Sequence, residues 1–199
     1  MRMRGDRGAT LALAVVAVLA GGCGSTAPPT LGGNPSAYLL TLDQLPSPDF
    51  TVYLAAAPIG AGWLDPGSST AVERDGLVEA AEVEYYRQVA FATSNGPITL
   101  TAAAARFTDS AGAAAAISHL DTALDARSGA SPVSTGSLAG GHAITVEGTL
   151  DGVQALEIVV LWRVENLVNS LDAEGRAGGL ALDQLLPLAT TQSANELRR

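Results

Sequence analysis

The chain has 199 residues, of which eleven are basic and twenty acidic, so its formal net charge is −9. Because so acidic a surface repels phosphate, nucleic-acid binding is disfavoured. The chain contains one cysteine, which excludes an internal disulfide and leaves the fold to depend on packing. With 47% hydrophobic residues, the chain is long enough to bury an apolar core in one domain.

Residues 1–22 have the three parts of an export signal. Arg2, Arg4 and Arg7 precede ten apolar residues, 11–20, and small residues follow them. As a helix, ten residues reach about 15 Å, roughly half the thickness of a bilayer core. We therefore expect a signal peptide over residues 1–22 that is removed, rather than a permanent membrane span.

Cys23 follows this segment directly. The residues before it, 19–22, resemble the lipobox of bacterial lipoproteins, at which a diacylglyceryl group joins the cysteine before cleavage. The aliphatic residue usually stands three positions before the cysteine, whereas Leu19 stands four before it and Ala20 occupies that place. Ordinary signal peptidase cleavage after Ala20 is the alternative, and it leaves Cys23 as a free thiol. Two or three acyl chains, at about 0.8 kcal/mol per CH₂, hold a protein stably at a membrane.

A flexible linker is predicted between Cys23 and the folded domain. Residues 24–36 are rich in Pro, Gly, Ser and Thr, and fully extended they span at most about 45 Å. Without residues 1–22 the chain has eight arginines and nineteen acidic residues, a net charge of −11. We expect one acidic globular domain over residues 37–199, held close to the membrane.

The first half of this domain reads as alternating strands and helices. A short helix is predicted over residues 38–45, a strand over 50–54, a Gly- and Pro-rich loop over 58–68, and a helix over 70–81. Two strands, 82–92 and 98–107, flank the turn Ser94-Asn95-Gly96-Pro97, which indicates a β-hairpin.

The second half begins with a helix over residues 109–126, capped by Asp109. A loop over 128–141, with a possible short strand at Val133, leads to strands 144–150, 153–163 and 167–171. Both faces of the strand 153–163 carry apolar residues, which indicates a central strand. The last helix is predicted over about 180–197, and Pro187 requires that its first turn lie near Asp183.

The order of these elements predicts the fold class. Hairpin connections require antiparallel neighbours. We therefore expect an α+β two-layer sandwich, in which an antiparallel sheet of about five to six strands carries its helices mainly on one face.

Three segments carry a resemblance to a known group of proteins. The segments YLLTLDQLP, ARFTDSAGAAAAISHL and VVLWRVENLVNSL look like parts of secreted lipoproteins of actinobacteria. More distantly, residues 38–195 resemble PknH-like extracellular sensor domains of mycobacterial kinases, which implies a two-layer α/β module with a cleft. Those sensor domains contain disulfides and this domain contains none, so the resemblance carries only an expectation of the fold.

No catalytic constellation is visible in the sequence. His119 is predicted on a solvent-facing helix surface, and His142 stands at the entrance of a strand. With two distant histidines and no available cysteine, a zinc site of usual composition is nearly excluded. Neither a G-x-S-x-G nucleophile motif nor any lysine is present. We therefore predict no catalytic residue, no metal and no cofactor.

Aromatic residues are the best candidates for ligand binding. Trp63 lies in the Gly- and Pro-rich loop, and Tyr85 and Tyr86 lie on a predicted strand. An apolar pocket between that loop and the sheet is one interpretation, with Trp63, Tyr85, Tyr86, His142 and Trp162 as possible ligand-binding residues. For any single aromatic residue, however, packing in the core, or closure of the loop over it, is the favoured explanation.

Two functions remain open from the sequence. The first is a noncatalytic binding or interaction domain, anchored at the extracytoplasmic side of the membrane through a lipid on Cys23. Its partner would be a small hydrophobic molecule or a protein of the cell envelope. The second is an envelope enzyme with an unrecognised site near His142 and neighbouring carboxylates.

Overall fold

The structure is a computed structural model that describes residues 30–136 and 138–198. The predicted signal peptide and Cys23 lie outside the described residues. The strands are β1 (Phe50–Ile59), β2 (Leu77–Arg87), β3 (Thr99–Phe107), β4 (Ala130–Val133), β5 (His142–Leu150), β6 (Val153–Val164) and β7 (Leu167–Arg176). The helices are α1 (Ser69–Arg74), α2 (Ser110–Asp125) and α3 (Leu186–Leu197).

All seven strands belong to one sheet, in the order β1-β2-β3-β7-β6-β5-β4, and every neighbouring pair is antiparallel. The predicted antiparallel α+β class is thus confirmed, but the sheet has seven strands rather than five to six. The additional strand is β4, which pairs with β5 over four residues and forms one edge. The sequence offered only a short strand at Val133 there, because four residues are too few to show alternation.

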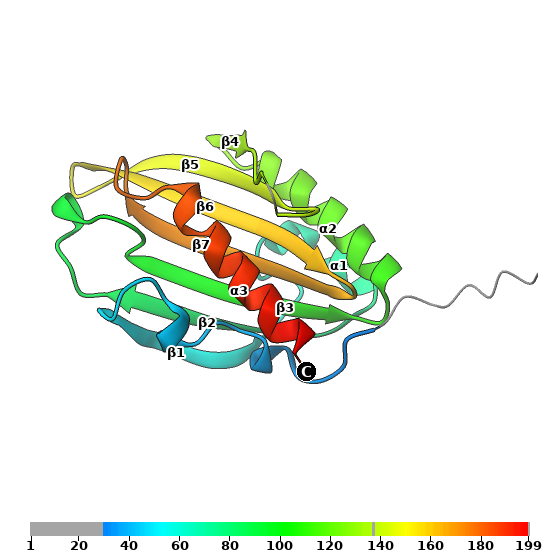
Figure 1. The fold of residues 1–199 in the computed structure, drawn as a ribbon. Helices are drawn as coiled ribbons and strands as arrows, with labels where there is room; N and C mark the ends of the chain where they lie inside the picture. The colour runs from blue at the N-terminus through cyan, green and yellow to red at the C-terminus, as the bar shows by residue number, and fades with distance from the viewer. Residues whose placement is uncertain (1–29, 137, 199) are drawn as a thin grey trace, which may run out of the picture.

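Helices cover both faces of this sheet, which corrects the prediction that they lie mainly on one face. In Figure 1, α3 crosses the front of the sheet, whereas α1 lies behind it. Strand β6 explains why both faces need cover: Val160 and Trp162 enter the core under α3, and Val159 and Leu161 enter the core under α2. We call these two clusters the α3-side core and the α2-side core. A strand that is apolar on both faces must be covered on both.

The first helix is shorter than predicted, because a glycine ends it. Helix α1 stops at Arg74, and Gly76 then adopts a φ of +91° before β2 begins at Leu77. A Cβ at Gly76 would lie 2.5 Å from Thr108 Oγ1, so a side chain there would also clash. Residues 77–81, predicted as helix, therefore belong to a strand.

Helix α2 begins where its sequence predicts, and the last helix begins later than the predicted start at about residue 180. Asp109 caps α2 by accepting a hydrogen bond of 2.8 Å from the Gly112 amide. Pro187 lies in the first turn of α3, where the missing N–H has no helical partner to lose. Helix α3 itself begins at Leu186, after a 3₁₀ turn over Leu182–Gln184.

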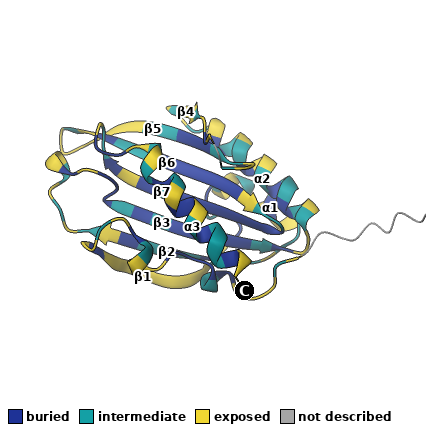
Figure 2. Cartoon of the chain, viewed as in Figure 1, coloured by how far each residue is buried: buried dark blue, intermediate teal, exposed yellow. Residues whose placement is uncertain are grey.

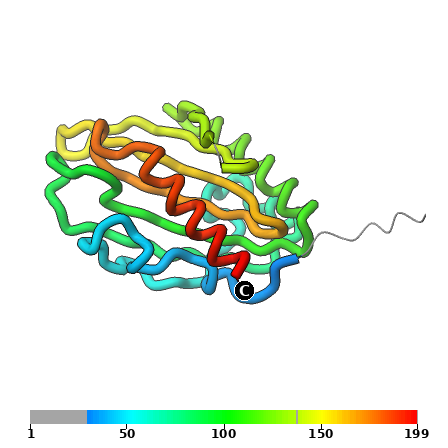
Figure 3. The backbone as a smooth tube through the Cα atoms, in the orientation of Figure 1, coloured from blue at the N-terminus to red at the C-terminus, as the bar shows by residue number. Residues whose placement is uncertain are grey.

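The chain before β1 packs beside α3 instead of forming the helix predicted over residues 38–45. It makes two 3₁₀ turns, Pro35–Ala37 and Leu42–Gln44, and the leucines between them join the α3-side core. Figure 3 shows this segment passing close to the end of α3. Residues 30–36, predicted as linker, also contact the fold, since the Leu31 amide donates a hydrogen bond of 2.6 Å to Asn166 Oδ1.

Burial differs strongly between the middle of the sheet and β1 (Figure 2). Most residues of β3, β6 and β7 are buried or half-buried, because helices lie over both of their faces. Residues 51–58 of β1 are all exposed. β1 is therefore the strand with the longest exposed stretch, and it is free to contact other molecules.

Candidate functional site

Two of the aromatic residues predicted as ligand-binding lie in the closed α3-side core. Tyr85 is 2% exposed and its hydroxyl donates a hydrogen bond of 2.5 Å to the Leu40 carbonyl oxygen. Trp162 is 1% exposed, and its Nε1 donates a hydrogen bond of 2.9 Å to Ser193 Oγ on α3. These contacts fasten the segment before β1 and α3 to the sheet. In this conformation both rings are closed to solvent.

Trp63 lies on the opposite face, where the loop before α1 meets the sheet. Its ring packs against the α2-side core, and Nε1 donates a hydrogen bond of 3.3 Å to Ser170 Oγ on β7. Arg127 holds the same loop, because its Nη2 donates a hydrogen bond of 2.6 Å to the Leu64 carbonyl oxygen. These contacts hold the loop against the same face of the sheet that α2 covers.

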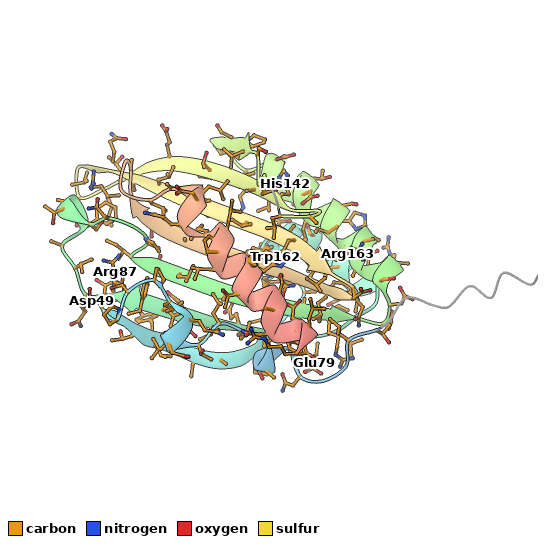
Figure 4. All side chains as sticks on the ribbon, in the orientation of Figure 1. Asp49, Glu79, Arg87, His142, Trp162 and Arg163 are labelled. Atoms are coloured by element: carbon orange, nitrogen blue, oxygen red, sulfur yellow. The ribbon has the colours of Figure 1, made fainter. Side chains whose placement is uncertain are left out.

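His142 lies near the other edge of the sheet, away from Arg87 (Figure 4). Its Nε2 is 3.0 Å from Asp125 Oδ1 on α2. Burial raises the pKa of nearby Asp121, while His142 lowers that pKa and Asp125 raises it. The described residues place no serine, threonine or cysteine in hydrogen-bond contact with His142. His142 Nε2 makes no hydrogen bond within the described residues, so it forms an ion pair with Asp125 only when the imidazole is protonated, and the arrangement offers no hydroxyl or thiol nucleophile.

Tyr86 lies on the α2 side of β2 and belongs to an exposed surface. Together with Tyr53, Glu84 and Thr99 it lines an open hollow of about 300 Å³. The side chains come from three adjacent strands, because Thr51 pairs with Tyr86 and Tyr86 pairs with Thr99 in the sheet register. Tyr53 is 65% exposed and Tyr86 is 37% exposed, so both rings are accessible.

A second hollow of about 240 Å³ adjoins the first and shares Thr99 with it. Carboxylates dominate its lining, which consists of Thr99, Thr101, Glu157, Asp172 and Glu174. Register explains the gathering: Thr101 lies opposite Asp172, and Glu157 lies opposite Glu174. We call the two linings together the acidic face; its residues are Tyr53, Glu84, Tyr86, Thr99, Thr101, Glu157, Asp172 and Glu174.

The acidic face is uncovered because the strands change character along their length. On β3, Ala105 packs into the α2-side core, while Thr99 and Thr101 lie beyond it on the same face. Strand β7 changes in the same way from Val168 to Asp172. Helix α2 and the Trp63 loop cover the apolar end of the strands, and nothing in the described chain covers the polar end.

The carboxylates of the acidic face repel one another. Burial, followed by the charge of Glu157, raises the pKa of Asp172 to about 7, although Arg127 lowers it. Burial and the nearby Glu84 also raise the pKa of Glu82 on β2. Arg127 Nη1 lies 2.9 Å from Glu157 Oε1 and so offsets part of the negative charge. A cation arriving at this face would relieve repulsion among carboxylates.

The described residues lack the arrangements that would hold a metal or cross a membrane. Nowhere in residues 30–136 and 138–198 do three His, Cys, Asp or Glu side chains come close enough to share a metal ion. None of the helices in the same residues is both long and apolar enough to span a bilayer.

Comparison with known proteins gives a similarity of fold. No protein-family model matches the chain, and no curated protein sequence does so either. The structure resembles the extracellular domain of PknH from Mycobacterium tuberculosis, with a TM-score of 0.52 and 11% sequence identity. The match covers 84% of this chain and 100% of that domain. At this level of identity the shared property is the fold, in agreement with the resemblance seen in the sequence.

Sequence reasoning found one residue of the acidic face, Tyr86, and missed the others. Glu84 and Tyr53 carry no motif that would single them out. Asp172 was hidden for another reason: the last strand was predicted to end at Leu171, whereas β7 continues to Arg176. Its charge between the buried residues Leu171 and Ala173 is the signal that would have found it.

Proposed function

We propose that the protein is a noncatalytic binding domain of the cell envelope, exported and held at the membrane by a lipid on Cys23. Three observations support the proposal: the export pattern of residues 1–22, the position of Cys23 directly after it, and a fold similar to an extracellular domain. An anchor of two or three acyl chains keeps such a domain at the membrane surface.

The acidic face is the observation that carries the binding role. It presents two exposed tyrosines and several carboxylates on strands of one sheet, so the groups are held rigidly in place. Exposed tyrosines are typical of protein interfaces, because the ring supplies apolar area and the hydroxyl supplies a hydrogen bond.

Between the two partners expected from the sequence, this surface favours an envelope protein over a small hydrophobic molecule. The hollow that contains Asp172 is lined mainly by carboxylates and threonines, which bind apolar molecules poorly. An apolar ligand would need a hydrophobic pocket, yet Tyr85 and Trp162 fill the core instead.

A photo-crosslinking experiment in the native host tests anchoring and binding together. Tyr53 is replaced by the photoreactive residue p-benzoylphenylalanine in the full chain, and Leu150, which is also exposed, is replaced in a matched control. We expect a discrete protein adduct from position 53 in the membrane fraction and none from position 150. Identical adducts at both positions, or none at position 53, would reject the binding role of this surface.

A Cys23→Ser substitution in the same experiment tests the anchor. We expect the substituted protein in the medium or unprocessed, and the adduct lost from the membrane fraction. Unchanged processing and membrane retention would show that Cys23 is not the anchor, while leaving the result at position 53 to decide the binding role.

A further inference from the structure

The free edge of the sheet at β1 has the features of a docking strand. β1 is the first strand in the order of the sheet and spans ten residues. In an edge strand about half of the residues turn their N–H and C=O groups away from the sheet, where another strand can pair with them.

This edge carries two of the usual protections of edge strands, Pro58 and two shifts of register with β2, but it is long and uncharged. β1 contains no charged residue, and Val52, Tyr53 and Leu54 are 46%, 65% and 51% exposed. The opposite edge, β4, is four residues long and includes Pro132, which cannot donate a backbone hydrogen bond. In β1 the proline, Pro58, stands next to the end of the strand, so residues 50–57 keep their backbone N–H groups and β1 is the more open edge for strand addition.

Irregular pairing shapes the outer face of β1. The register with β2 shifts between Val52 and Leu54 and again between Leu54 and Ala57. The register before the first shift already places Tyr53 beside Glu84 and Tyr86 on the α2 side, and the shift brings Leu54 opposite Glu84 as well. An incoming strand would thus meet two regular stretches, 50–52 and 57–59, with an aromatic and apolar patch between them.

Both faces of the sheet are hollowed beside β1. On the α2 side is the hollow between Tyr53, Glu84 and Tyr86, of about 300 Å³. On the α3 side is a hollow of about 320 Å³, lined by residues that include Asn34, Ala57, Pro58 and Glu79. Alternate side chains of an added strand point to opposite faces, so each set would find a hollow.

Charge decides what kind of strand fits. Glu84 stands in the nearer hollow, and Glu157, Asp172 and Glu174 continue the same face. The two tyrosine rings offer faces that attract cations. A second copy of this chain would bring a net charge of −9 to the edge and is disfavoured, whereas a basic segment is attracted.

We propose that β1 is the docking strand for an extended basic segment of an envelope protein, which adds to the sheet as an eighth strand. An arginine or lysine of that segment lies against Tyr53 and Tyr86 and pairs with Glu84. The inference rests on the proposed function and deepens it by naming the chemistry of the partner.

Hydrogen exchange with a defined peptide tests the proposal. The probe is a capped ten-residue peptide with arginine and valine at alternating positions, added to the full chain in a nonionic detergent. The matched probe has glutamate in place of arginine. We expect the arginine peptide to slow amide exchange in residues 51–57 at least tenfold at saturation, with β4 unchanged, and the glutamate peptide to have no effect.

Substitutions in β1 and β2 then locate the contact. Leu54→Lys places a charge on the edge and should weaken arginine-peptide binding at least tenfold, and Tyr53→Ala should weaken it several-fold. Glu84→Gln should weaken binding and reduce its salt dependence. Leu150→Lys alters an exposed leucine in the β5–β6 hairpin, so binding should be unchanged. Exchange rates of β6 and β7 amides verify that each variant is folded.

Each other result would overturn the proposal in a distinct way. Equal protection by both peptides would remove the preference for a basic partner, and protection that grows with protein concentration alone would identify a second copy as the occupant. No protection by either peptide, together with an adduct at position 53 in cells, would reject strand addition while leaving the proposed function intact. Protection without that adduct would instead contradict the proposed function.

Discussion

The apolar cores on the two faces of the sheet differ in how far they extend. On the α3 side the core runs from Phe50 on β1 to Ile158 and Trp162 on β6, beneath α3 and the segment before β1. On the α2 side the core stops short, and the strands continue into the exposed acidic face. The centre of the sheet is stabilised by apolar packing on both of its faces. Part of the α2-side face has no such packing and is left for contacts with other molecules.

A buried or half-buried carboxyl on each face shows the same difference. Glu196 on α3 has no exposed surface, and burial raises its pKa to about 8, although the neighbouring Asn169 side chain lowers it. Asp172 is half-buried, and burial followed by the charge of Glu157 raises its pKa to about 7. Glu196 stands alone under a helix, whereas Asp172 belongs to a group of acids that are open to solvent.

Removing one large aromatic side chain from each face should produce the largest contrast. We expect Trp162→Ala to lower the free energy of unfolding by about 3–5 kcal/mol, because it leaves a cavity in the α3-side core. Tyr86→Ala should lower it by less than about 1 kcal/mol, because the ring is exposed. Urea unfolding followed by circular dichroism measures both. Comparable losses in the two variants would contradict the division between the faces.

The carboxyl under α3 should make stability depend on pH. The pKa of Glu196 rises from 4.5 to about 8 on folding, so the folded protein keeps a proton that the unfolded chain releases. The contribution of Glu196 to the free energy of unfolding is therefore fully present below pH 4.5 and is lost as pH rises through 8. We expect Glu196→Gln to match the wild type near pH 4 and to exceed its free energy of unfolding by a few kcal/mol, on the order of 3, at pH 9.

Urea unfolding of the variant and the wild type at several pH values measures this difference. Glu147→Gln, which changes an exposed glutamate on β5, is the matched control and should follow the wild type. A Glu196→Gln protein that gained no stability between pH 4 and pH 9 would show that the carboxyl is not buried in the folded state.

The half-buried carboxyl on the acidic face should give the smallest effect, with the same sign. The pKa of Asp172 rises from 3.8 to about 7 on folding, so its contribution to stability is lost as pH rises through 7. Solvent screening reduces the energetic cost of the charged carboxylate. We therefore expect the free energy of unfolding of Asp172→Asn to exceed that of the wild type by on the order of 1–2 kcal/mol at pH 8. Carboxyl NMR titration should also show that Glu157→Gln lowers the pKa of Asp172. An unchanged value would exclude coupling between these two acids.

Local signals in the sequence predicted most of the elements. The hairpin at Asp151 and Gly152, the Asp109 cap and the position of Pro187 all depend on neighbouring residues, and the structure confirms them. The errors have equally local causes. The helix predicted over residues 70–81 ends at Arg74, because Gly76 adopts a positive φ that a helix does not allow. The apolar residues that follow Gly76 fit a strand as well as a helix.

The residues of the acidic face could not be predicted from their neighbours in the sequence. Asp172 and Thr101 come together because β7 pairs with β3, a contact between segments far apart in the chain. Glu84 and Tyr53 meet because β1 pairs with β2 in a register that places Thr51 opposite Tyr86 and Val52 opposite Tyr85. Strand order and register are set by the packing of the whole sheet, so no local motif marked these residues.

The sequence by itself determined the cap of α2, the turn at Asp151 and Gly152, that β6 is apolar on both faces, and that Cys23 follows an export pattern. Each of these follows from periodicity, capping or composition, which act over a few residues. Only the tertiary structure decided that helices cover both faces, that β1 is left at an uncovered edge, and which acids share a surface. Those properties depend on which strands pair, and pairing is chosen by burial of the whole core rather than by any single segment.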